Sequence, residues 1–253
     1  MLSKNKIKFI RSLDYKKQRN ETGLFVAEGN KLVADILPFF DCELLIAKPA
    51  WIAAQSNLPV RELIAADDND ISKASLLKNP QDVIAVFVQP KRCLDKKMLK
   101  NELTLVLDGI QDPGNLGTII RIANWFGIRN LIGSPDTADV YNPKTVQASM
   151  GSIAQVDVFY QSLPELLDEM KDFPIYGTFL DGKILYEENL HSTGLIVMGN
   201  EGNGIRPEVE QRITHRLYIP NFPQGAASTE SLNVAVATAI VCGEFRRQQV
   251  YLG

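Results

Sequence analysis

The sequence predicts an α/β protein with two domains, and three observations carry this prediction. Apolar runs of strand length alternate with segments of helical spacing. Several of these runs lack polar alternation, which is typical of parallel strands buried on both faces. The stretch 90–100 is charged and poor in apolar residues, which is typical of a domain boundary. We therefore expect a smaller domain over residues 1–90, a linker over 91–102 and a second domain over 103–253.

The first 90 residues predict a small mixed α/β domain. Residues 3–18 place apolar side chains at helical spacing, with lysines between them. Pro38 ends a second helix. The expected strands are 24–27, 43–47, 60–65 and 83–88, and the expected helices are 3–18, 28–37, 49–56 and 71–77.

The second half alternates more regularly, which predicts a parallel sheet flanked by helices. Leu103 begins an apolar run that ends at Asp108-Gly109, and Pro164 occupies the first turn of a helix. The expected strands are 103–107, 130–133, 156–159, 175–180, 195–198 and 217–219. The expected helices are 116–126, 143–150, 164–171, 207–213 and 232–247.

Composition excludes several classes of protein. No apolar run approaches the roughly 18 residues of a membrane-spanning helix, and no apolar segment follows the basic N-terminus as in a signal peptide. The three cysteines are scattered and only two histidines are present, so we expect no metal site. These features predict a cytoplasmic protein in a reducing compartment.

Basic residues gather in two places despite the net charge of −3. Residues 1–20 carry seven lysines and arginines against one aspartate, a net charge of +6, and residues 91–100 carry five against one, a net charge of +4. Such clusters are either solvated helix faces or a surface that tracks phosphates. The expected RNA-binding residues are Lys4, Lys6, Arg11, Lys16, Lys17 and Arg19.

Glycine-rich turns follow three of the apolar runs, in residues 108–117, 199–204 and 219–233. Ligands of open parallel sheets bind at the carboxyl ends of strands, where these turns would lie. The sequence does not match two familiar nucleotide-binding motifs. Proline at position 207 replaces the third glycine of a dinucleotide fingerprint, and Gly182-Lys183 is followed by isoleucine rather than the serine or threonine of a P-loop.

The order of the motifs resembles the SpoU (TrmH-like) family of SPOUT RNA methyltransferases. The resemblance covers residues 103–247 and consists of DPGNLG at 112–117 followed by Arg121, VMGNEGNG at 197–204, and Ile219-Pro220 leading to SLNVAVA at 231–237. Residues 1–90 are similar to the family's N-terminal RNA-binding domain, which is like ribosomal protein L30e. The link 221–230 is longer than in the family's shorter members.

The resemblance implies an α/β-knot, in which the C-terminal segment threads a loop to form a trefoil knot. It implies S-adenosylmethionine as cofactor, a homodimer, and a 2′-O-methylated ribose as the product, while the composition predicts no membrane and no metal as partners. Tight turns and an apolar wall suit a nucleoside cofactor. The residues that match cofactor positions are Gly199, Gly202, Ile219, Pro220 and Leu232.

The resemblance also assigns the catalytic residues, which are Asn115, Arg121, Glu201, Ser231 and Asn233. A guanidinium with a pKa above about 12 is a poor base, so we expect Arg121 to bind the target phosphate and stabilise alkoxide character. Ordinary structural roles compete with these assignments. Asn115, Ser231 and Asn233 could cap helices, and Glu201 could occupy a turn.

Three alternatives to ribose methylation of ribosomal RNA remain at this stage. The first is a transfer RNA 2′-O-methyltransferase of the same family, although a separate N-terminal domain favours ribosomal RNA, most specifically 23S. The second is a methyltransferase that acts on a base. The third is a catalytically silent RNA-binding protein, against which the presence of Asn115, Arg121, Glu201 and Ser231 argues.

Overall fold

The computed structural model describes residues 2–223 and 231–251, which form two compact units. One unit consists of the chain up to Arg92 together with Asp139–Ala154, and the other of Cys93–Ala138 and the chain from Gln155 onward. Residues 139–154 thus pack with the N-terminal unit, although they lie inside the range 103–253 that the sequence suggested for the second domain.

The N-terminal unit is built on a four-stranded sheet in the order β1-β4-β2-β3. β4 pairs antiparallel with β1 and β2, and β2 pairs parallel with β3. Apolar residues of the strands and of α1 and α5 form its core. Its elements are α1 (Lys4–Ser12), α2 (Lys16–Thr22), β1 (Leu24–Glu28), α3 (Asn30–Ile36), β2 (Cys42–Ala47), α4 (Pro49–Ala53), β3 (Leu63–Ala65), α5 (Asp68–Ala74), β4 (Val83–Val88) and α8 (Pro143–Ser149).

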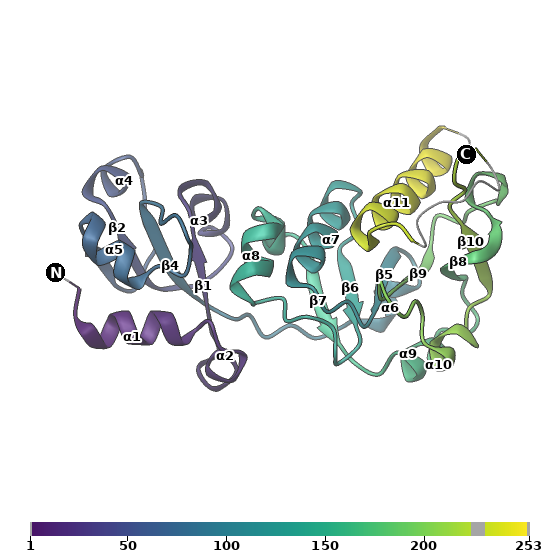
Figure 1. Ribbon diagram of the computed structural model, residues 1–253, viewed down its shortest axis with the longest axis horizontal. Helices are drawn as coiled ribbons and strands as arrows, with labels where there is room; N and C mark the ends of the chain where they lie inside the picture. Colours follow the sequence, from purple (N-terminus) through teal and green to yellow (C-terminus); the bar gives the residue numbers. More distant parts are fainter. Residues whose placement is uncertain (1, 224–230, 252–253) are drawn as a thin grey trace. The chain divides into compact units, whose positions relative to one another are not determined.

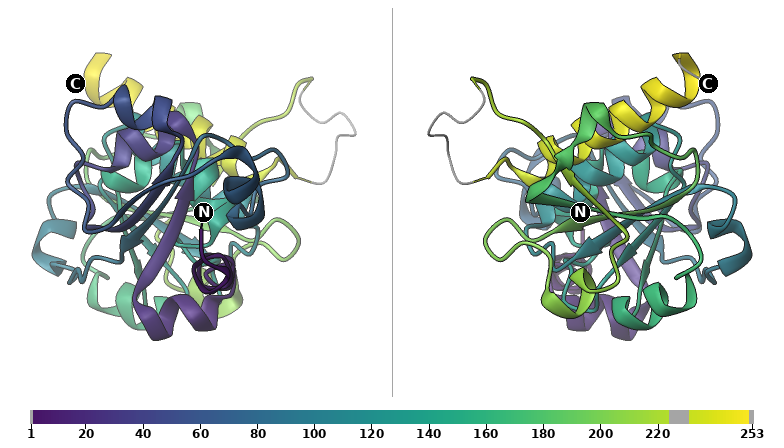
Figure 2. Two further views of the ribbon diagram at one scale, coloured as in Figure 1. Left: turned by 90° about the vertical axis from the view of Figure 1, so that its left-hand side faces the viewer. Right: turned by 90° about the vertical axis from the view of Figure 1, so that its right-hand side faces the viewer.

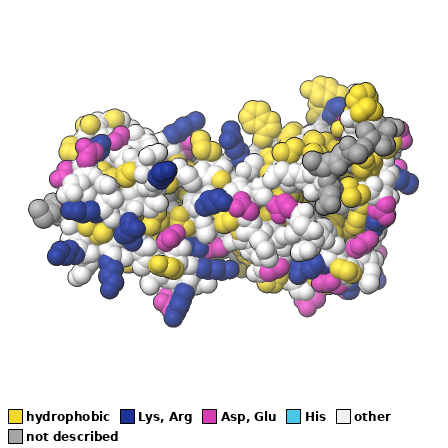
Figure 3. Space-filling view, viewed as in Figure 1, with side chains coloured by type: hydrophobic (Ala, Val, Ile, Leu, Met, Phe, Trp, Pro, Cys, Tyr) yellow, Lys and Arg dark blue, Asp and Glu magenta, His cyan; other side chains and the backbone are white. Residues whose placement is uncertain are grey.

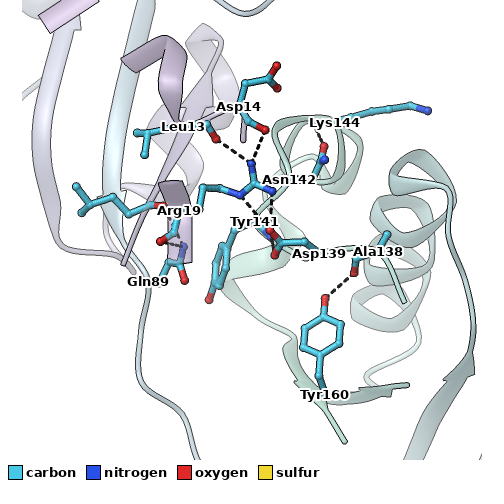
Figure 4. A network of polar contacts seen from close by, with 11 residues as sticks. Leu13, Asp14, Arg19, Gln89, Ala138, Asp139, Tyr141, Asn142, Lys144 and Tyr160 are labelled. Atoms are coloured by element: carbon cyan, nitrogen blue, oxygen red, sulfur yellow. Dashed lines mark hydrogen bonds and ion pairs between the residues drawn. The ribbon is translucent and has the colours of Figure 1, made fainter. Parts of the chain in front are cut away.

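The helix expected over 3–18 is in fact two helices. α1 ends at Ser12, and Tyr15 adopts an extended backbone with φ −88° and ψ 128° before α2 begins. The break has a physical cause. The side chain of Arg19, on α2, donates from Nη1 to the carbonyl oxygens of Leu13 (2.8 Å) and Asp14 (2.7 Å), which holds the chain in this corner (Figure 4).

Arg19 is a structural residue, so the expectation that it contacts RNA is wrong. Its side chain is 1% exposed. Its Nε and Nη2 donate to Asp139 Oδ2 at 3.0 and 2.6 Å, so the guanidinium is occupied within the unit (Figure 4). Beside it, the ring of Tyr141 lies 4.8 Å from that of Phe25. These contacts fasten the segment 139–154 onto β1 and α2.

The other basic residues of the N-terminus differ in how free they are. Arg11 donates to the carbonyl oxygen of Ser75 at 2.9 Å, and Lys6 forms an ion pair with Glu62. Lys4, Lys16 and Lys17 are exposed, and Figure 3 shows Lys and Arg side chains over the part of the surface that carries α1 and α2. The RNA contacts of these five residues stay a prediction.

The second unit contains a six-stranded sheet in the order β10-β8-β9-β5-β6-β7, with every neighbouring pair parallel. This confirms the expected parallel α/β architecture. Its elements are α6 (Lys96–Leu99), β5 (Leu103–Asp108), α7 (Pro113–Trp125), β6 (Asn130–Gly133), β7 (Asp157–Tyr160), α9 (Leu163–Glu169), β8 (Ile175–Ile184), β9 (Gly194–Gly199), α10 (Pro207–Glu210), β10 (His215–Tyr218) and α11 (Val234–Tyr251).

Helices cover both faces of this sheet, as Figures 1 and 2 show. α9 and α10 pack on one face through Leu166, Leu167 and Val209, which join a core of strand residues. α7 and α11 lie side by side on the other face (Figure 1). The two helices run in the same direction. Asn233 at the start of α11 donates a hydrogen bond to Asn115 at the start of α7, and Arg246 near the end of α11 donates one to the carbonyl oxygen of Phe126 at the end of α7.

The stretch 91–102, which the sequence suggested as a linker, contains the short helix α6. Within the described residues, no helix is long and apolar enough to cross a membrane. Part of the link 221–230, namely 224–230, lies outside the described residues, and the trefoil knot stays a prediction.

Candidate active site

The two central strands of the six-stranded sheet end side by side. Asp108 at the end of β5 pairs with Gly199 at the end of β9, in a parallel register. The turns that follow, 109–112 and 200–206, therefore leave the sheet at the same edge. This edge is where ligands of open parallel sheets bind, and it confirms the placement expected for these two turns.

A cavity of about 760 Å³ opens at this edge. Its walls come from the turn after β9, from Thr178–Leu180 of β8, and from Ile219, Ser231 and Leu232 on either side of the residues that are not described. Ligand sites of roughly 300–1,000 Å³ hold small molecules and cofactors. The cavity is therefore large enough for a nucleoside cofactor.

A bulge in β8 shapes one wall of the cavity. His215 and Arg216 of β10 pair with Tyr176 and Gly177, but the next residue, Leu217, pairs with Lys183. Residues 178–182 thus have no partner on β10 and leave the sheet. The bulge directs part of β8 into the cavity.

The guanidinium of Arg216 holds this wall in place. Its carbon lies 3.6 Å from the ring centroid of Phe179, which is a cation–π contact. Arg216 also pairs with Asp181 and Glu210 at 2.5 Å each, and these hydrogen bonds raise its pKa. Among the described residues that line the cavity, the charged ones are Glu201, Glu210 and Arg216.

Gly199 is required by the turn itself. A Cβ at this position would lie 2.4 Å from the backbone carbon of Gly204, closer than real atoms approach. Asn200 and Gly204 exchange backbone hydrogen bonds at 3.0 and 2.9 Å, which closes the turn. The glycine thus permits a backbone-to-backbone approach, and the turn that results forms the cavity wall.

A polar cluster lies beside the cavity. Asn115 donates from Nδ2 to Glu201 Oε1, and Asn233 donates from Nδ2 to Asn115 Oδ1 at 3.0 Å. The three residues come from α7, from the turn after β9 and from the start of α11. All three catalytic motifs suggested by the sequence therefore meet at one place.

Two helices begin at this cluster. Asp112 caps α7 by accepting from the backbone N–H of Asn115 at 2.8 Å, so Asn115 lies inside the helix and is not its cap. Asn233 caps α11 by accepting from Ala235 (3.0 Å) and Val236 (3.3 Å). Each helix N-terminus carries a partial positive charge of about half a unit. Both partial charges lie beside the Glu201 carboxylate.

The expected site residues divide into three groups. Gly199, Glu201, Gly202, Ile219, Ser231 and Leu232 line the cavity. Asn115 and Asn233 reach it through Glu201, and Pro220 follows the lining residue Ile219. Arg121 is exposed on α7, six residues beyond Asn115, which is about 9 Å along the helix. Within the described part of the chain, no hydrogen bond or ion pair engages its guanidinium.

Three residues at this edge were not anticipated from the sequence. Arg206 pairs with Asp108 through Nε (2.7 Å) and Nη2 (2.5 Å). Asn200 donates from Nδ2 to the carbonyl oxygen of Gly109 at 2.7 Å. The only signal available was position, because Asp108 and Asn200 each directly follow a buried apolar run.

Comparison with known proteins agrees with this geometry. Residues 102–243 match the SpoU rRNA Methylase family, and residues 4–85 match the MRM3-like substrate binding domain. The chain belongs to the SpoU family. The resemblance noted in the sequence is thereby confirmed.

Individual relatives cover nearly the whole chain. The 23S rRNA (guanosine(2553)-2′-O)-methyltransferase RlmP of Bacillus subtilis is 32% identical over 246 residues, 95% of this chain and 96% of RlmP. A solved structure from Porphyromonas gingivalis, assigned to the TrmH family of RNA methyltransferases, is 43% identical with a TM-score of 0.86, over 98% of this chain and 99% of that one. An AdoMet-bound rRNA methyltransferase from Sinorhizobium meliloti is 30% identical with a TM-score of 0.82, over 99% and 97% of the two chains.

Proposed function

We propose that this SpoU protein transfers a methyl group from S-adenosylmethionine to a ribose 2′-hydroxyl in 23S ribosomal RNA. The observation that carries the proposal is the cluster of Asn115, Glu201 and Asn233 beside a cavity of about 760 Å³. The relative RlmP, named as a 23S rRNA 2′-O-methyltransferase, supports the RNA class, since it aligns over 95% of this chain.

The residues of the cavity fit the proposed cofactor. Leu180, Met198 and Ile205 supply apolar surface for a nucleoside base, and Ser231 and the backbone of the glycine turn supply polar groups. The carboxylates of Glu201 and Glu210 suit a cofactor that carries a sulfonium and an ammonium group. When bound, S-adenosylmethionine supplies an electrophilic methyl group. Gly199, Gly202, Ile219, Pro220 and Leu232 would hold it.

The polar cluster would orient the acceptor hydroxyl and stabilise its developing negative charge. The N-termini of α7 and α11 point their partial positive charges to this place. Asn115 and Asn233 fix the position of Glu201, which lies between the cavity and the helices. Ser231, exposed at the cavity, would contact the ribose.

In the proposed mechanism, Arg121 binds the phosphate of the target nucleotide. That phosphate would accept the proton of the ribose 2′-hydroxyl. An exposed guanidinium without a protein partner in the described residues is free to bind a phosphate in its bidentate geometry. Replacement by lysine tests this role, because lysine keeps the charge but loses the planar fork. Near-normal turnover of Arg121→Lys would exclude it.

The N-terminal unit would supply the RNA contacts. Exposed Lys4 and Lys16 can contact phosphates directly, whereas Lys17, Lys6 and Arg11 would have to share their contacts with Glu21, Glu62 and the Ser75 carbonyl. Ribosomal RNA in the cytoplasm is the proposed partner. The proposal assigns no role to a metal ion.

A homodimer is proposed on the outer face of the helix pair α7 and α11. Trp125 is 84% exposed, and Val236 and Val250 are 50% and 63% exposed on the neighbouring helix. Figure 3 shows apolar side chains over this region. Exposed apolar surface of this kind is typical of protein interfaces.

Methyl transfer from a radiolabelled donor to 23S ribosomal RNA tests the proposed function directly. Digestion of the product separates the alternatives. A labelled dinucleotide that resists alkaline hydrolysis indicates 2′-O-methylation, and a labelled mononucleotide indicates a base methyltransferase. Transfer RNA in a parallel reaction tests the tRNA alternative. Calorimetry that detects no donor binding, with or without RNA, would leave the silent RNA-binding protein.

A further inference from the structure

Arg206 joins the ends of the two central strands. The Asp108 carboxylate, whose side chain is 0% exposed, ends β5. It accepts two hydrogen bonds from Arg206, from the backbone N–H at 2.8 Å and from Nε at 2.7 Å, and it forms an ion pair with Nη2 at 2.5 Å. Arg206 thus ties the end of the turn after β9 to the end of β5.

Asn200 makes the matching connection at the other end of the same turn. Its Nδ2 donates to the carbonyl oxygen of Gly109 at 2.7 Å, and its Oδ1 accepts from the backbone N–H groups of Gly202 (2.9 Å) and Asn203 (3.1 Å). The turn 200–206 is therefore attached to the end of β5 twice, once at each of its own ends.

Each of these two contacts lies close along the chain to a proposed catalytic residue. The chain runs from Asp108 through a short loop into α7, where Asn115 lies, and the turn carries Glu201. Gly202 and Asn203 are exposed, so packing does not fix the middle of the turn. The contacts at the ends of the turn therefore help to set where Glu201 lies relative to Asn115, in addition to the hydrogen bond between the two side chains.

We propose that Arg206 is a positioning residue for methyl transfer: its pairing with Asp108 holds the turn 200–206 where Glu201 meets Asn115 and forms the cofactor wall. This inference rests on the proposed function, which it extends to a residue outside the three motifs. Arg206 does not line the cavity among the described residues, so it would act through the turn.

The test replaces Arg206 with methionine, which keeps the length of the side chain and removes the pairing. Misplacement of a catalytic group by about 1 Å can lower turnover on the order of hundredfold. We expect kcat to fall tenfold to hundredfold and the Kd for S-adenosylmethionine to rise severalfold, because the turn forms both the active site and the cofactor wall. RNA affinity should stay within about twofold of wild type.

Arg212→Met is the matched control. Arg212 holds Asp168 with a fork of similar geometry, at 2.7 and 2.8 Å, and neither residue lines the cavity among those described. Its removal takes away an arginine and an ion pair from the same unit. We expect kcat and cofactor affinity to stay at wild-type values, which separates positioning from general loss of stability.

Two further variants make the result decisive. Arg206→Lys keeps the charge and should recover part of the lost turnover. The double variant Asp108→Asn/Arg206→Met removes the buried charge together with its partner, and so remains testable if the single variant fails to fold. Because the two residues act as one pair, the double variant should be no worse than Arg206→Met alone.

Two results would overturn the inference: wild-type kcat and cofactor affinity in a folded Arg206→Met or double variant, or an equal loss in Arg212→Met. Failure of the proposed function is a separate outcome, since it would appear as absence of methyl transfer by the wild-type protein in the same assay.

Discussion

Replacing Asn115 with alanine tests the polar cluster most directly. The Asn115 side chain donates to the Glu201 carboxylate and accepts from Asn233. A hydrogen bond to a charged group contributes about 1.5–3 kcal/mol and a neutral one about 0.5–1.5 kcal/mol. Because Asn115 is half-buried, we take values near the lower end of the sum, about 2–3 kcal/mol.

If this energy is used to position groups in the transition state, kcat of Asn115→Ala should fall about 30- to 150-fold. The cofactor affinity should change by less than about threefold, since Asn115 does not line the cavity among the described residues. Asn115→Asp should be slower still, because it places a second carboxylate against Glu201. Single-turnover methyl transfer measures the chemical step, and calorimetry measures donor binding.

Thr118→Ala is the control on the same helix. Thr118 is exposed one turn further along α7, and its hydroxyl donates to the carbonyl oxygen of Gly114 at 2.8 Å. This variant should transfer methyl at the wild-type rate. Turnover of folded Asn115→Ala within threefold of wild type, or equal losses in both variants, would refute the reasoning.

Four more predictions concern stability, RNA binding and assembly. Arg19→Met leaves the mostly buried Asp139 carboxylate unpaired and should lower the free energy of unfolding by about 3–5 kcal/mol in urea titrations; a loss below 1 kcal/mol would contradict the structural role. Lys4→Ala with Lys16→Ala should weaken RNA binding and reduce the slope of log affinity against log salt by about 0.7–0.9 per phosphate contact, and an unchanged slope would count against these contacts. Burial raises the pKa of Glu28 above its ordinary value, so ionisation of this carboxyl lowers the stability of the folded protein as the pH rises above the unfolded-state pKa of about 4.3; the stability of Glu28→Gln relative to wild type should therefore increase as the pH rises, and a difference that does not change with pH would exclude this. Trp125→Glu should shift the protein to monomers in light-scattering measurements, and an unchanged mass would exclude the proposed interface.

Strands could be predicted most accurately where the chain is mainly apolar, whereas β8 and β10, which carry polar and charged residues, have other bounds than the expected 175–180 and 217–219. β4 and β6 coincide with the expected 83–88 and 130–133. Helix starts were less accurate where the cap was polar and lay outside the apolar pattern. α7 begins at Pro113, capped by Asp112, although the periodic residues begin at Leu116. α5 likewise begins at Asp68 because Asp67 caps it, whereas the apolar pattern starts at Ile71.

Arg19 shows where sequence reasoning fails for charged residues. It lies in a cluster with a net charge of +6, and the pattern gives it the same weight as Lys16 and Lys17. Its partner, Asp139, is 120 residues away, so no local pattern reveals the pairing. The pairing of Arg206 with Asp108 could not be predicted for the same reason, since the two residues are 98 positions apart. Motif spacing identifies groups that contact a ligand, whereas supporting pairs become visible only in the fold.

The electrostatics of the cluster explain why its central residue is an amide. Methyl transfer begins with a sulfonium cation and a neutral hydroxyl, and it builds negative charge on the acceptor oxygen. The site needs a negative group near the donor and positive potential near the acceptor. Glu201 lines the cavity and, in the proposed mechanism, would be the negative group near the donor, and the N-termini of α7 and α11 would supply the positive potential near the acceptor. A lysine at position 115 would neutralise Glu201, and an aspartate would cancel the helix ends. The Asn115 amide donates to the Glu201 carboxylate and accepts from Asn233 at the start of α11. It therefore links the carboxylate to the helix N-termini without changing the charge of either.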